Sequence, residues 1–290
     1  MSPPTDVRRR RAEREEDTMM KMIWGAALLA AACVSETNHT KRPVASATPP
    51  EPSRAPAARA EPSQPARAEP SQPARAEPSE PVRDAAPFWL DSAETVLVYP
   101  PVSAARPQPV TVFLHGMCDA PEIECPWIAP AATSHGWLVC PRAGVACQGG
   151  GTAWSLGDVG RRVDSAVAAL TAARPGELSE DDGRIAGFSL GGTAALKLAL
   201  EGRGRWSRVV VIAARVALER AQLERAGVSS VVLAAGELDT TYDGMRAVAR
   251  RLDRAGFPAT FLSLGKVGHT FPADMDAKMV GALGGSMPGG

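Results

Sequence analysis

One five-residue stretch, residues 187–191, reads GFSLG and joins a short apolar run, Arg184 to Phe188, directly to a run rich in Ala and Leu. The pattern Gly-x-Ser-x-Gly in this context predicts a sharp strand-to-helix turn that holds a serine hydroxyl above the edge of a sheet. A side chain on either glycine would crowd such a turn. N–H groups at the start of the following helix would face the space beside the hydroxyl, where a negative oxygen could be stabilised. The turn therefore needs a strand with a helix packed on it, and it predicts Ser189 as a nucleophile.

Short apolar runs alternate with helical patterns from about Pro87 onward. Strands are expected over Thr95–Tyr99, Val110–Leu114, Trp137–Cys140, Arg184–Phe188, Arg208–Ile212, Val231–Ala235 and Ala259–Leu264. Helices are expected over Asp158–Ala173, Leu190–Glu201, Ala217–Ala226 and Thr240–Ala255. Most of the strand runs are continuously apolar, as in a sheet covered on both faces. We therefore expect residues 87–290 to form one α/β domain, with a mostly parallel central sheet and helices on both faces.

Histidine is scarce in this chain, which narrows the choice of a general base. The four histidines are His39, His115, His135 and His269. His269 is the only one after Ser189, and it follows the last expected strand, where catalytic groups gather in open α/β folds. The matching acid is expected after the preceding strand, and Asp239 stands there. Asp243 and Glu237 are the alternatives, and Asp239 could also cap the next helix.

Stabilisation of a negative oxygen requires two backbone donors. One is expected from Leu190, the residue after the serine. The other is expected from the loop after Val110–Leu114, where Gly116 lets the backbone turn and leaves the N–H of Met117 free. His115 would then orient this loop and take no part in the chemistry. Little sequence separates the strand Arg208–Ile212 from the next helix, so we expect a minimal lid. The open pocket should be bordered by Trp127, Trp154 and the glycines 149–151.

These motifs, taken in order, resemble those of the α/β-hydrolase superfamily. They are an apolar strand ending in HGM (residues 115–117), GFSLG, GELD (236–239) and GHT (268–270). The likeness is strongest to the small dienelactone-hydrolase-like and carboxylesterase-like branches, and it covers Val96 to the C-terminus. It implies Ser189 as nucleophile, His269 as base and Asp239 as acid, with an acyl-enzyme mechanism that needs no metal or cofactor. Dienelactone hydrolases proper use a cysteine nucleophile, so the serine argues against that particular reaction.

The leading hypothesis is hydrolysis of a carboxylic ester, either a small molecule or a polymer. A serine peptidase is the enzymatic alternative, and no propeller or large cap domain supports it. A non-catalytic binding module on a hydrolase scaffold is the other alternative, although a scaffold would not need the complete set of motifs. The formal net charge of zero gives no argument for nucleic acid as a partner. No feature of the sequence predicts an oligomeric state.

Residues 1–33 have the pattern of an export signal. An apolar run, Met22 to Ala32, lies between Lys21 and Cys33. The run is too short to span a bilayer but suits a signal-peptide core. It resembles a bacterial lipoprotein signal, which implies lipidation of Cys33, although Ala30 stands where such signals usually carry Leu. We expect a cell-envelope lipoprotein of the periplasm or outer membrane, in contact with a membrane only through this anchor. Ordinary secretion is the alternative.

Residues 34–86 are expected to be a disordered spacer. Pro, Ala, Glu, Arg and Ser dominate, and an eight-residue repeat begins at Arg59, Arg67 and Arg75. Almost no large apolar side chain is available to offset the entropy of ordering this segment. Two prolines in each repeat favour a semi-extended linker.

Four cysteines lie within the expected domain: Cys118, Cys125, Cys140 and Cys147. An even number in an exported domain suggests two disulfides. Three pairings are possible, and the equal gaps favour Cys118–Cys125 and Cys140–Cys147, each closing one local loop. A zinc site is the alternative, but the gaps exceed normal ligand spacing and no histidine joins them.

Overall fold

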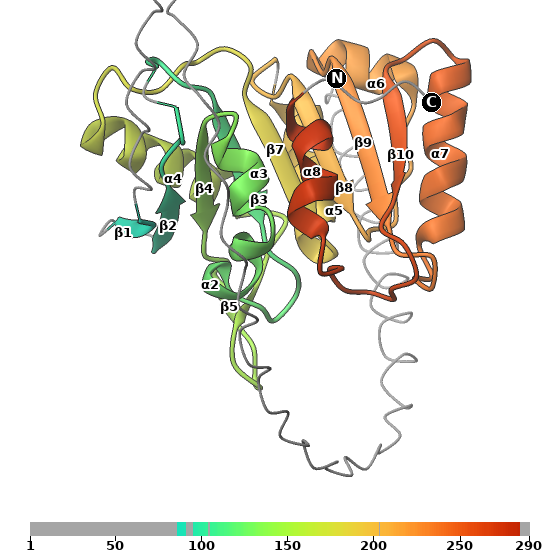
Figure 1. The fold of residues 1–290 in the computed structure, drawn as a ribbon, viewed down its shortest axis with the longest axis horizontal. Helices are drawn as coiled ribbons and strands as arrows, with labels where there is room; N and C mark the ends of the chain where they lie inside the picture. The colour runs from blue at the N-terminus through green and yellow to red at the C-terminus, as the bar shows by residue number, and fades with distance from the viewer. Residues whose placement is uncertain (1–85, 91–94, 104, 203, 285–290) are drawn as a thin grey trace, which may run out of the picture. The chain divides into compact units, whose positions relative to one another are not determined.

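A computed structural model describes residues 86–90, 95–103, 105–202 and 204–284. Its centre is an eight-stranded sheet in the order β1-β2-β4-β3-β7-β8-β9-β10 (Figure 1). The strands are β1 Phe88–Leu90, β2 Val96–Tyr99, β3 Val110–Leu114, β4 Trp137–Pro141, β7 Arg184–Phe188, β8 Arg208–Ile212, β9 Ser230–Ala235 and β10 Ala259–Ser263. Strand β2 is antiparallel to both of its neighbours, whereas every pair from β4 to β10 is parallel. The predicted mostly parallel sheet is confirmed.

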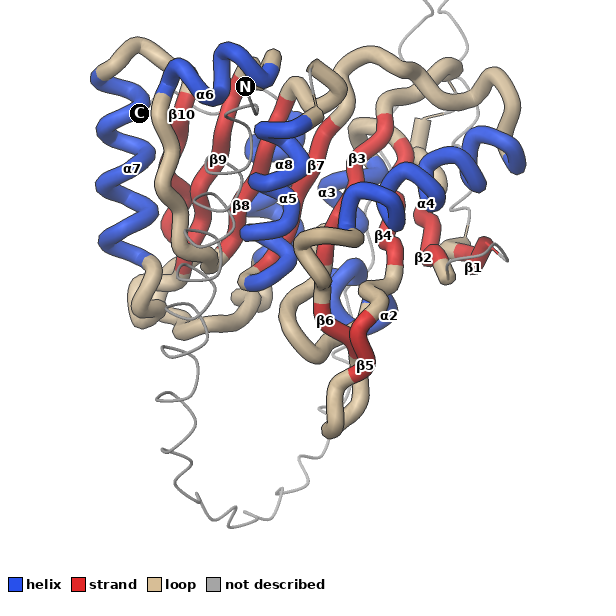
Figure 2. The backbone as a smooth tube through the Cα atoms, turned by 180° about the vertical axis from the view of Figure 1, so that it is seen from behind, coloured by secondary structure: helices blue, strands red, loops and turns tan. Residues whose placement is uncertain are grey.

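Helices cover both faces of this sheet, as predicted (Figures 1 and 2). They are α2 Pro121–Glu124, the 3-10 helix η1 Cys125–Trp127, α3 Ala129–Thr133, α4 Val159–Ala173, α5 Leu190–Glu201, α6 Arg220–Ala226, α7 Tyr242–Arg254 and α8 Met275–Gly284. Buried side chains of α4, α5, α6 and α7 pack on one face. Those of α3 and α8 pack on the other. A separate two-stranded ribbon joins β5 Val145–Ala146 to β6 Thr152–Ala153.

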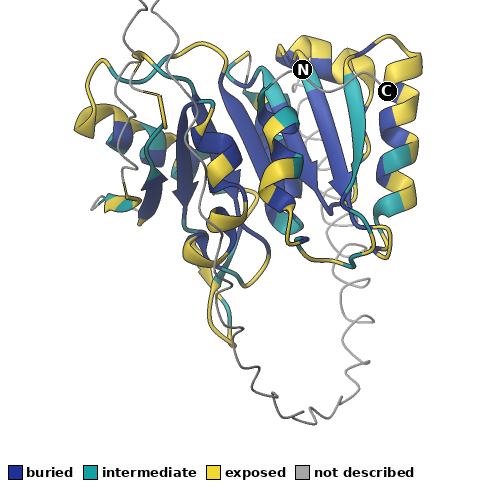
Figure 3. Cartoon of the chain, in the orientation of Figure 1, coloured by how far each residue is buried: buried dark blue, intermediate teal, exposed yellow. Residues whose placement is uncertain are grey.

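The core explains why these segments form these elements. All five residues of β3 and of β7 are buried, as Figure 3 shows for the central strands, which fits their mostly apolar sequences. On α4 the buried residues Val159, Val163, Ala166 and Leu170 recur at helical spacing and form one apolar stripe. Burial of each valine or leucine in this stripe contributes about 1.5–3 kcal/mol.

The parallel strands all end at the same edge of the sheet, so the loops that follow them meet there. This is the lower edge in Figure 1, where α2 follows β3 and the β5–β6 ribbon follows β4. Ligands bind at this edge in open α/β sheets. Residues 213–219 alone connect β8 to α6, which leaves no room for a lid domain and confirms the predicted minimal lid.

The predictions for the export signal (residues 1–33) fall outside the described residues, as do those for all of the spacer except Ala86. Among the residues that are described, no helix is both long and apolar enough to cross a membrane.

Candidate active site

Ser189 occupies the sharp turn between β7 and α5. Its backbone angles are φ 53° and ψ −118°, a conformation that residues with side chains rarely adopt. A Cβ atom on Gly187 would lie 2.3 Å from the backbone oxygen of Gly191, and one on Gly191 would lie 2.0 Å from that of Leu114. Both glycines are therefore required by close backbone contacts, and the turn has the form that the sequence predicts.

His269 links the serine to the predicted acid. Its Nε2 atom lies 2.9 Å from Ser189 Oγ, and its Nδ1 atom lies 2.7 Å from Asp239 Oδ2. An ionised carboxylate can only accept a hydrogen bond, so Nδ1 carries the proton and Nε2 is free to accept from the serine hydroxyl. The His269 side chain is 49% exposed, whereas that of Asp239 is fully buried. Ser189, His269 and Asp239, the three residues that the sequence predicts for the site, thus form one continuous chain of hydrogen bonds.

Asp239 is held in its charged form by hydrogen bonds. Its Oδ1 atom accepts from the backbone N–H and from the hydroxyl of Thr241, both at 2.8 Å. Burial by itself raises the pKa of Asp239, but the bonds from Thr241 and His269 outweigh it and hold that pKa below its usual value. The alternatives lie elsewhere: Asp243 is in the first turn of α7, and Glu237 accepts a hydrogen bond from a hydroxyl on β10.

Thr241 is a functional residue that sequence analysis missed, although the sequence carried a signal for it. An Asp followed two residues later by a hydrogen-bonding residue is typical of a local turn closed by the Asp side chain. Helix α7 has Thr241 at its N-cap position, so Asp239 lies two residues before the cap. The cap role considered for Asp239 is replaced by this turn, which leaves Oδ2 for His269.

The two expected backbone donors are free. Within the described part of the chain, the N–H groups of Met117 and Leu190 donate to no protein group. The N–H of Leu190 is one of the unpaired groups at the start of α5. Met117 lies in the turn after β3, and its side chain is exposed. One donor thus lies at the start of a helix and the other in a loop, and both follow strands that end at the edge of the sheet where Ser189 lies.

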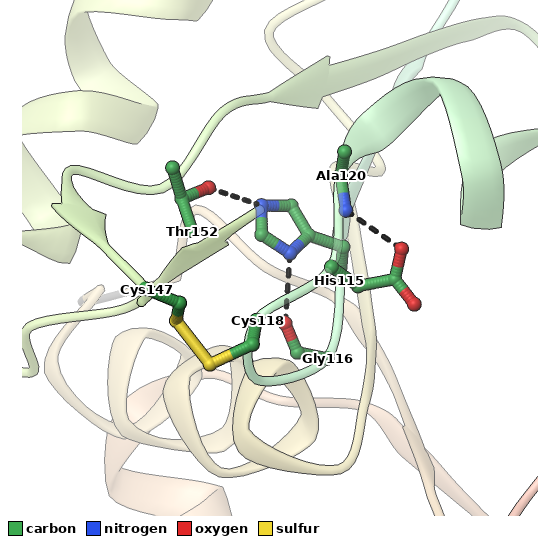
Figure 4. The surroundings of a disulfide bond; sticks show 7 residues. His115, Gly116, Cys118, Ala120, Cys147 and Thr152 are labelled. Atoms are coloured by element: carbon green, nitrogen blue, oxygen red, sulfur yellow. Dashed lines mark hydrogen bonds between the residues drawn. A yellow bond between two sulfur atoms is a disulfide. The ribbon is translucent and has the colours of Figure 1, made fainter. Parts of the chain in front are cut away.

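His115 fastens the loop that carries Met117 (Figure 4). The ring is buried, and its Nδ1 atom lies 2.8 Å from the backbone oxygen of Gly116. Its Nε2 atom accepts from the N–H of Ala143 at 3.2 Å, and the Thr152 hydroxyl lies 3.4 Å from the same atom. Burial lowers the pKa of His115, which keeps the ring neutral and suits it to accept at Nε2. The ring thus ties this loop to the segment after β4 and to the start of β6, in the orienting role expected of it.

Two disulfides are present, but the predicted pairing is wrong. Cys118 is bonded to Cys147, and Cys125 is bonded to Cys140. The sequence argument assumed that each bridge closes its own loop. Because β3 and β4 are neighbours in the sheet, the segment that follows β3 lies beside β4 and the segment after it. One bridge joins it to Cys140 in β4, and the other joins it to Cys147 after β4. Backbone pairing of Asp119 with the start of β6 brings the first pair together, and Figure 4 shows that bridge.

Aromatic rings run from the surface to the ring of His269. Trp127 stacks on Phe271 with ring centres 5.9 Å apart, and Phe271 lies 4.6 Å from Phe188. Phe188 in turn lies 4.9 Å from the ring of His269. Trp127 is 39% exposed, and its role at the border of the pocket stays a prediction. Trp154 is buried and donates its indole N–H to the backbone of the loop that carries Met117. The exposed glycines 149–151 connect β5 to β6, beside the Cys118–Cys147 bridge.

A cavity of about 500 Å³ opens elsewhere, near the starts of β3 and β7. Val110, Leu178, Gly183 and Trp206 are among its lining residues, and none of the three hydrogen-bonded residues of the candidate site is. We place the chemistry at the opposite edge of the sheet, because the ionisable chain and the free N–H groups are there. In the described residues, no group of three or more His, Cys, Asp or Glu side chains is arranged to hold a metal ion.

Comparisons with known proteins bear on the fold. No protein-family model matches the chain, and no curated protein matches it. Among solved structures, esterase PE8 is 21% identical over 66% of this chain and 97% of its own, with a TM-score of 0.52. A hyperthermophilic esterase from the archeon Pyrobaculum calidifontis is 16% identical over 71% of this chain and 83% of its own, with a TM-score of 0.52. A ferulic acid esterase is 15% identical over 68% of this chain and 95% of its own, also with a TM-score of 0.52. These likenesses, the strand order and the turn at Ser189 identify the fold of this chain as the α/β-hydrolase fold.

Proposed function

We propose that this protein is a serine hydrolase that cleaves a carboxylic ester through an acyl-enzyme intermediate. The observation that carries the proposal is the hydrogen-bonded chain from Ser189 through His269 to Asp239, beside two unpaired backbone N–H groups. Solved structures with the same fold include proteins named as esterases, which supports an ester as the substrate. An open site without a lid domain suits either a small or a polymeric ester.

In the first half of the reaction, His269 Nε2 takes the proton of Ser189 as its oxygen attacks the carbonyl carbon. The carbonyl π electrons move onto oxygen, and the N–H groups of Met117 and Leu190 stabilise that charge, each by about 3–4 kcal/mol. The ester C–O bond then breaks. His269 gives its proton to the leaving alkoxide, and the acyl group stays on Ser189. Asp239 remains ionised throughout and stabilises the imidazolium.

In the second half, His269 takes a proton from water as the water oxygen attacks the acyl carbon. The same two N–H groups stabilise the second charged intermediate. The bond to Ser189 Oγ then breaks, the serine recovers its proton from His269, and the carboxylic acid leaves. Every proton is carried by His269, whose ring is 49% exposed and can therefore exchange protons with water.

Hydrolysis of p-nitrophenyl acetate and butyrate by the full chain tests this proposal. We expect turnover by the wild type and a fall in kcat of at least about 10⁴-fold in Ser189→Ala. Ser165→Ala, on the outer helix α4, is the matched control and should keep wild-type kcat. Cleavage of peptide anilides in preference to the esters would favour a peptidase. No turnover, together with no labelling by a fluorophosphonate, would favour a binding module on a hydrolase scaffold.

We also propose that the domain, residues 87–290, is held at the cell envelope by a lipid on Cys33 and the spacer 34–86. The two disulfides support an oxidising compartment outside the cytoplasm. Detergent phase partitioning of the protein from a bacterial host tests the anchor. Wild type should enter the detergent phase, and Cys33→Ser should stay in the aqueous phase. Equal partitioning of the two would favour ordinary secretion.

A further inference from the structure

Glu124, the last residue of α2, lies buried behind the loop that carries Met117. It is 3% exposed, and its Oε2 atom accepts a hydrogen bond from the N–H of Gly116 at 2.9 Å. A Cβ atom on Gly116 would lie 2.9 Å from Oε1 of the same carboxyl and 3.0 Å from the ring of Phe188. The carboxyl group therefore packs directly against the backbone next to one expected donor, and the ring of the residue before Ser189 touches the same glycine.

The position of Glu124 is fixed from both sides. Its backbone N–H donates to Ala120 at 3.2 Å within α2. The next residue, Cys125, is fully buried and bonded to Cys140 of β4. The backbone that carries the Glu124 side chain is therefore anchored to α2 and to β4, and the bond from Gly116 ties the loop to this anchored position.

No cation neutralises this carboxyl group. Among the described residues, no lysine or arginine pairs with Glu124. A second carboxyl group in the same loop, that of Asp119, interacts with Glu124 and favours its protonated form, from which it can accept a hydrogen bond. His115 is buried and neutral, and Arg142, at the end of β4, pairs with Glu122 on the exposed side of α2.

The surroundings of Glu124 favour its uncharged form at neutral pH. Burial raises its pKa to about 8, and Asp119 adds to this effect, while the Gly116 N–H opposes it. A neutral acid can accept from Gly116 with one oxygen and donate to Asp119 with the other. An ionised one would place two carboxylates together and put a negative charge behind the site where the oxyanion forms.

We propose that Glu124, as a neutral carboxylic acid, is a positioning residue that supports the oxyanion loop from behind. Its Gly116 bond holds the N–H of Met117 in place, and its lack of charge avoids repulsion of the oxyanion. Loss of the proton keeps the Gly116 bond but sets the carboxylates of Glu124 and Asp119 against each other and places a negative charge behind the oxyanion, so kcat falls in the ionised enzyme. This inference rests on the proposed esterase function.

The test is kcat and KM of the full chain for p-nitrophenyl butyrate across pH 6–10, for wild type and three variants. Wild-type kcat should decline as Glu124 ionises, above pH of about 8. Glu124→Gln imitates the neutral acid, so it should keep at least about one third of wild-type kcat at pH 7 and lose that decline. Glu124→Ala should lower kcat about 10-fold at every pH, with little change in KM. Glu122→Gln, on the same helix, is the control and should follow the wild type.

The inference would be overturned if kcat of Glu124→Gln fell at alkaline pH as steeply as that of the wild type. It would also be overturned if Glu124→Ala kept the wild-type kcat. If the alanine variant does not fold, the pH profile of the glutamine variant still decides. Fluorophosphonate labelling of the wild type at pH 7 separates the two proposals. An enzyme that labels and turns over but shows no effect of Glu124 refutes only the positioning role. An enzyme that does neither refutes both.

Discussion

The two sides of the candidate site are held in different ways. Residues 115–152, which carry the expected donor Met117, are joined by two disulfides. Residues 236–271, which carry Asp239 and His269, have no disulfide and are held by hydrogen bonds such as those from Thr241. A backbone N–H that stabilises charge must already be in place, because its reorganisation would cost part of the stabilisation. A base that passes protons between three partners needs some freedom. The covalent links thus lie on the side that must stay fixed.

The largest effect on activity should come from a change in residues 236–271, the side of the site that hydrogen bonds hold in place. Asp239→Asn keeps the shape of the side chain but presents an amide to His269 Nδ1, which favours the wrong tautomer. We expect kcat for p-nitrophenyl butyrate to fall about 10⁴-fold with little change in stability. Asp243→Asn, in the first turn of α7, is the matched control. Equal loss in the two variants would mean that the carboxylate at 239 has no special role.

The next largest effect should come from removing a covalent link. Cys118→Ser with Cys147→Ser frees the turn next to Met117, and we expect kcat to fall about 10- to 100-fold through misplaced donors.

The buried bridge should matter more for stability. Cys125→Ala with Cys140→Ala should lower the free energy of unfolding by about 3 kcal/mol in denaturant titrations. Activity that does not change when both bridges are absent would contradict the idea that the donor side needs cross-linking.

A smaller effect is expected from one hydrogen bond to Asp239. Thr241→Val removes the hydroxyl bond and should lower the free energy of unfolding by about 1 kcal/mol at pH 7. The pKa of Asp239 is held below its usual value, so the stabilisation is complete above pH of about 4 and is lost as pH falls through the folded-state pKa. The difference between variant and wild type should therefore shrink in acid. Thr240→Val, at the exposed neighbouring position, should show no such pH dependence.

The smallest effect on activity should come from the exposed tryptophan near the candidate site. Trp127→Ala removes the exposed ring that stacks on Phe271, and we expect KM for the butyrate ester to rise about threefold with kcat unchanged. Trp89→Ala, exposed on the edge strand β1, should leave both constants unchanged. A large fall in kcat in Trp127→Ala would show that the ring positions His269 through the intervening phenylalanines and does not act as a substrate contact.

The same two sides differ in how well the sequence predicts them. The turn at Ser189 is local, and Asp239 and His269 each follow an apolar strand, so pattern and position were enough to select them. The disulfide pairing and the contact between Glu124 and Gly116 depend on β3 and β4 lying side by side. The spacing of residues along the chain does not show which strands are neighbours in the sheet. Strand β1 was missed because three residues are too few for a recognisable pattern.

The claim that Ser189 attacks the substrate is tested most directly by locating a covalent adduct. The full chain would be treated with a fluorophosphonate, digested, and its labelled peptide identified by mass spectrometry. We expect one adduct, on Ser189, that forms far more slowly in His269→Ala. An adduct on another residue, or ester hydrolysis that continues with Ser189 unlabelled, would contradict the account.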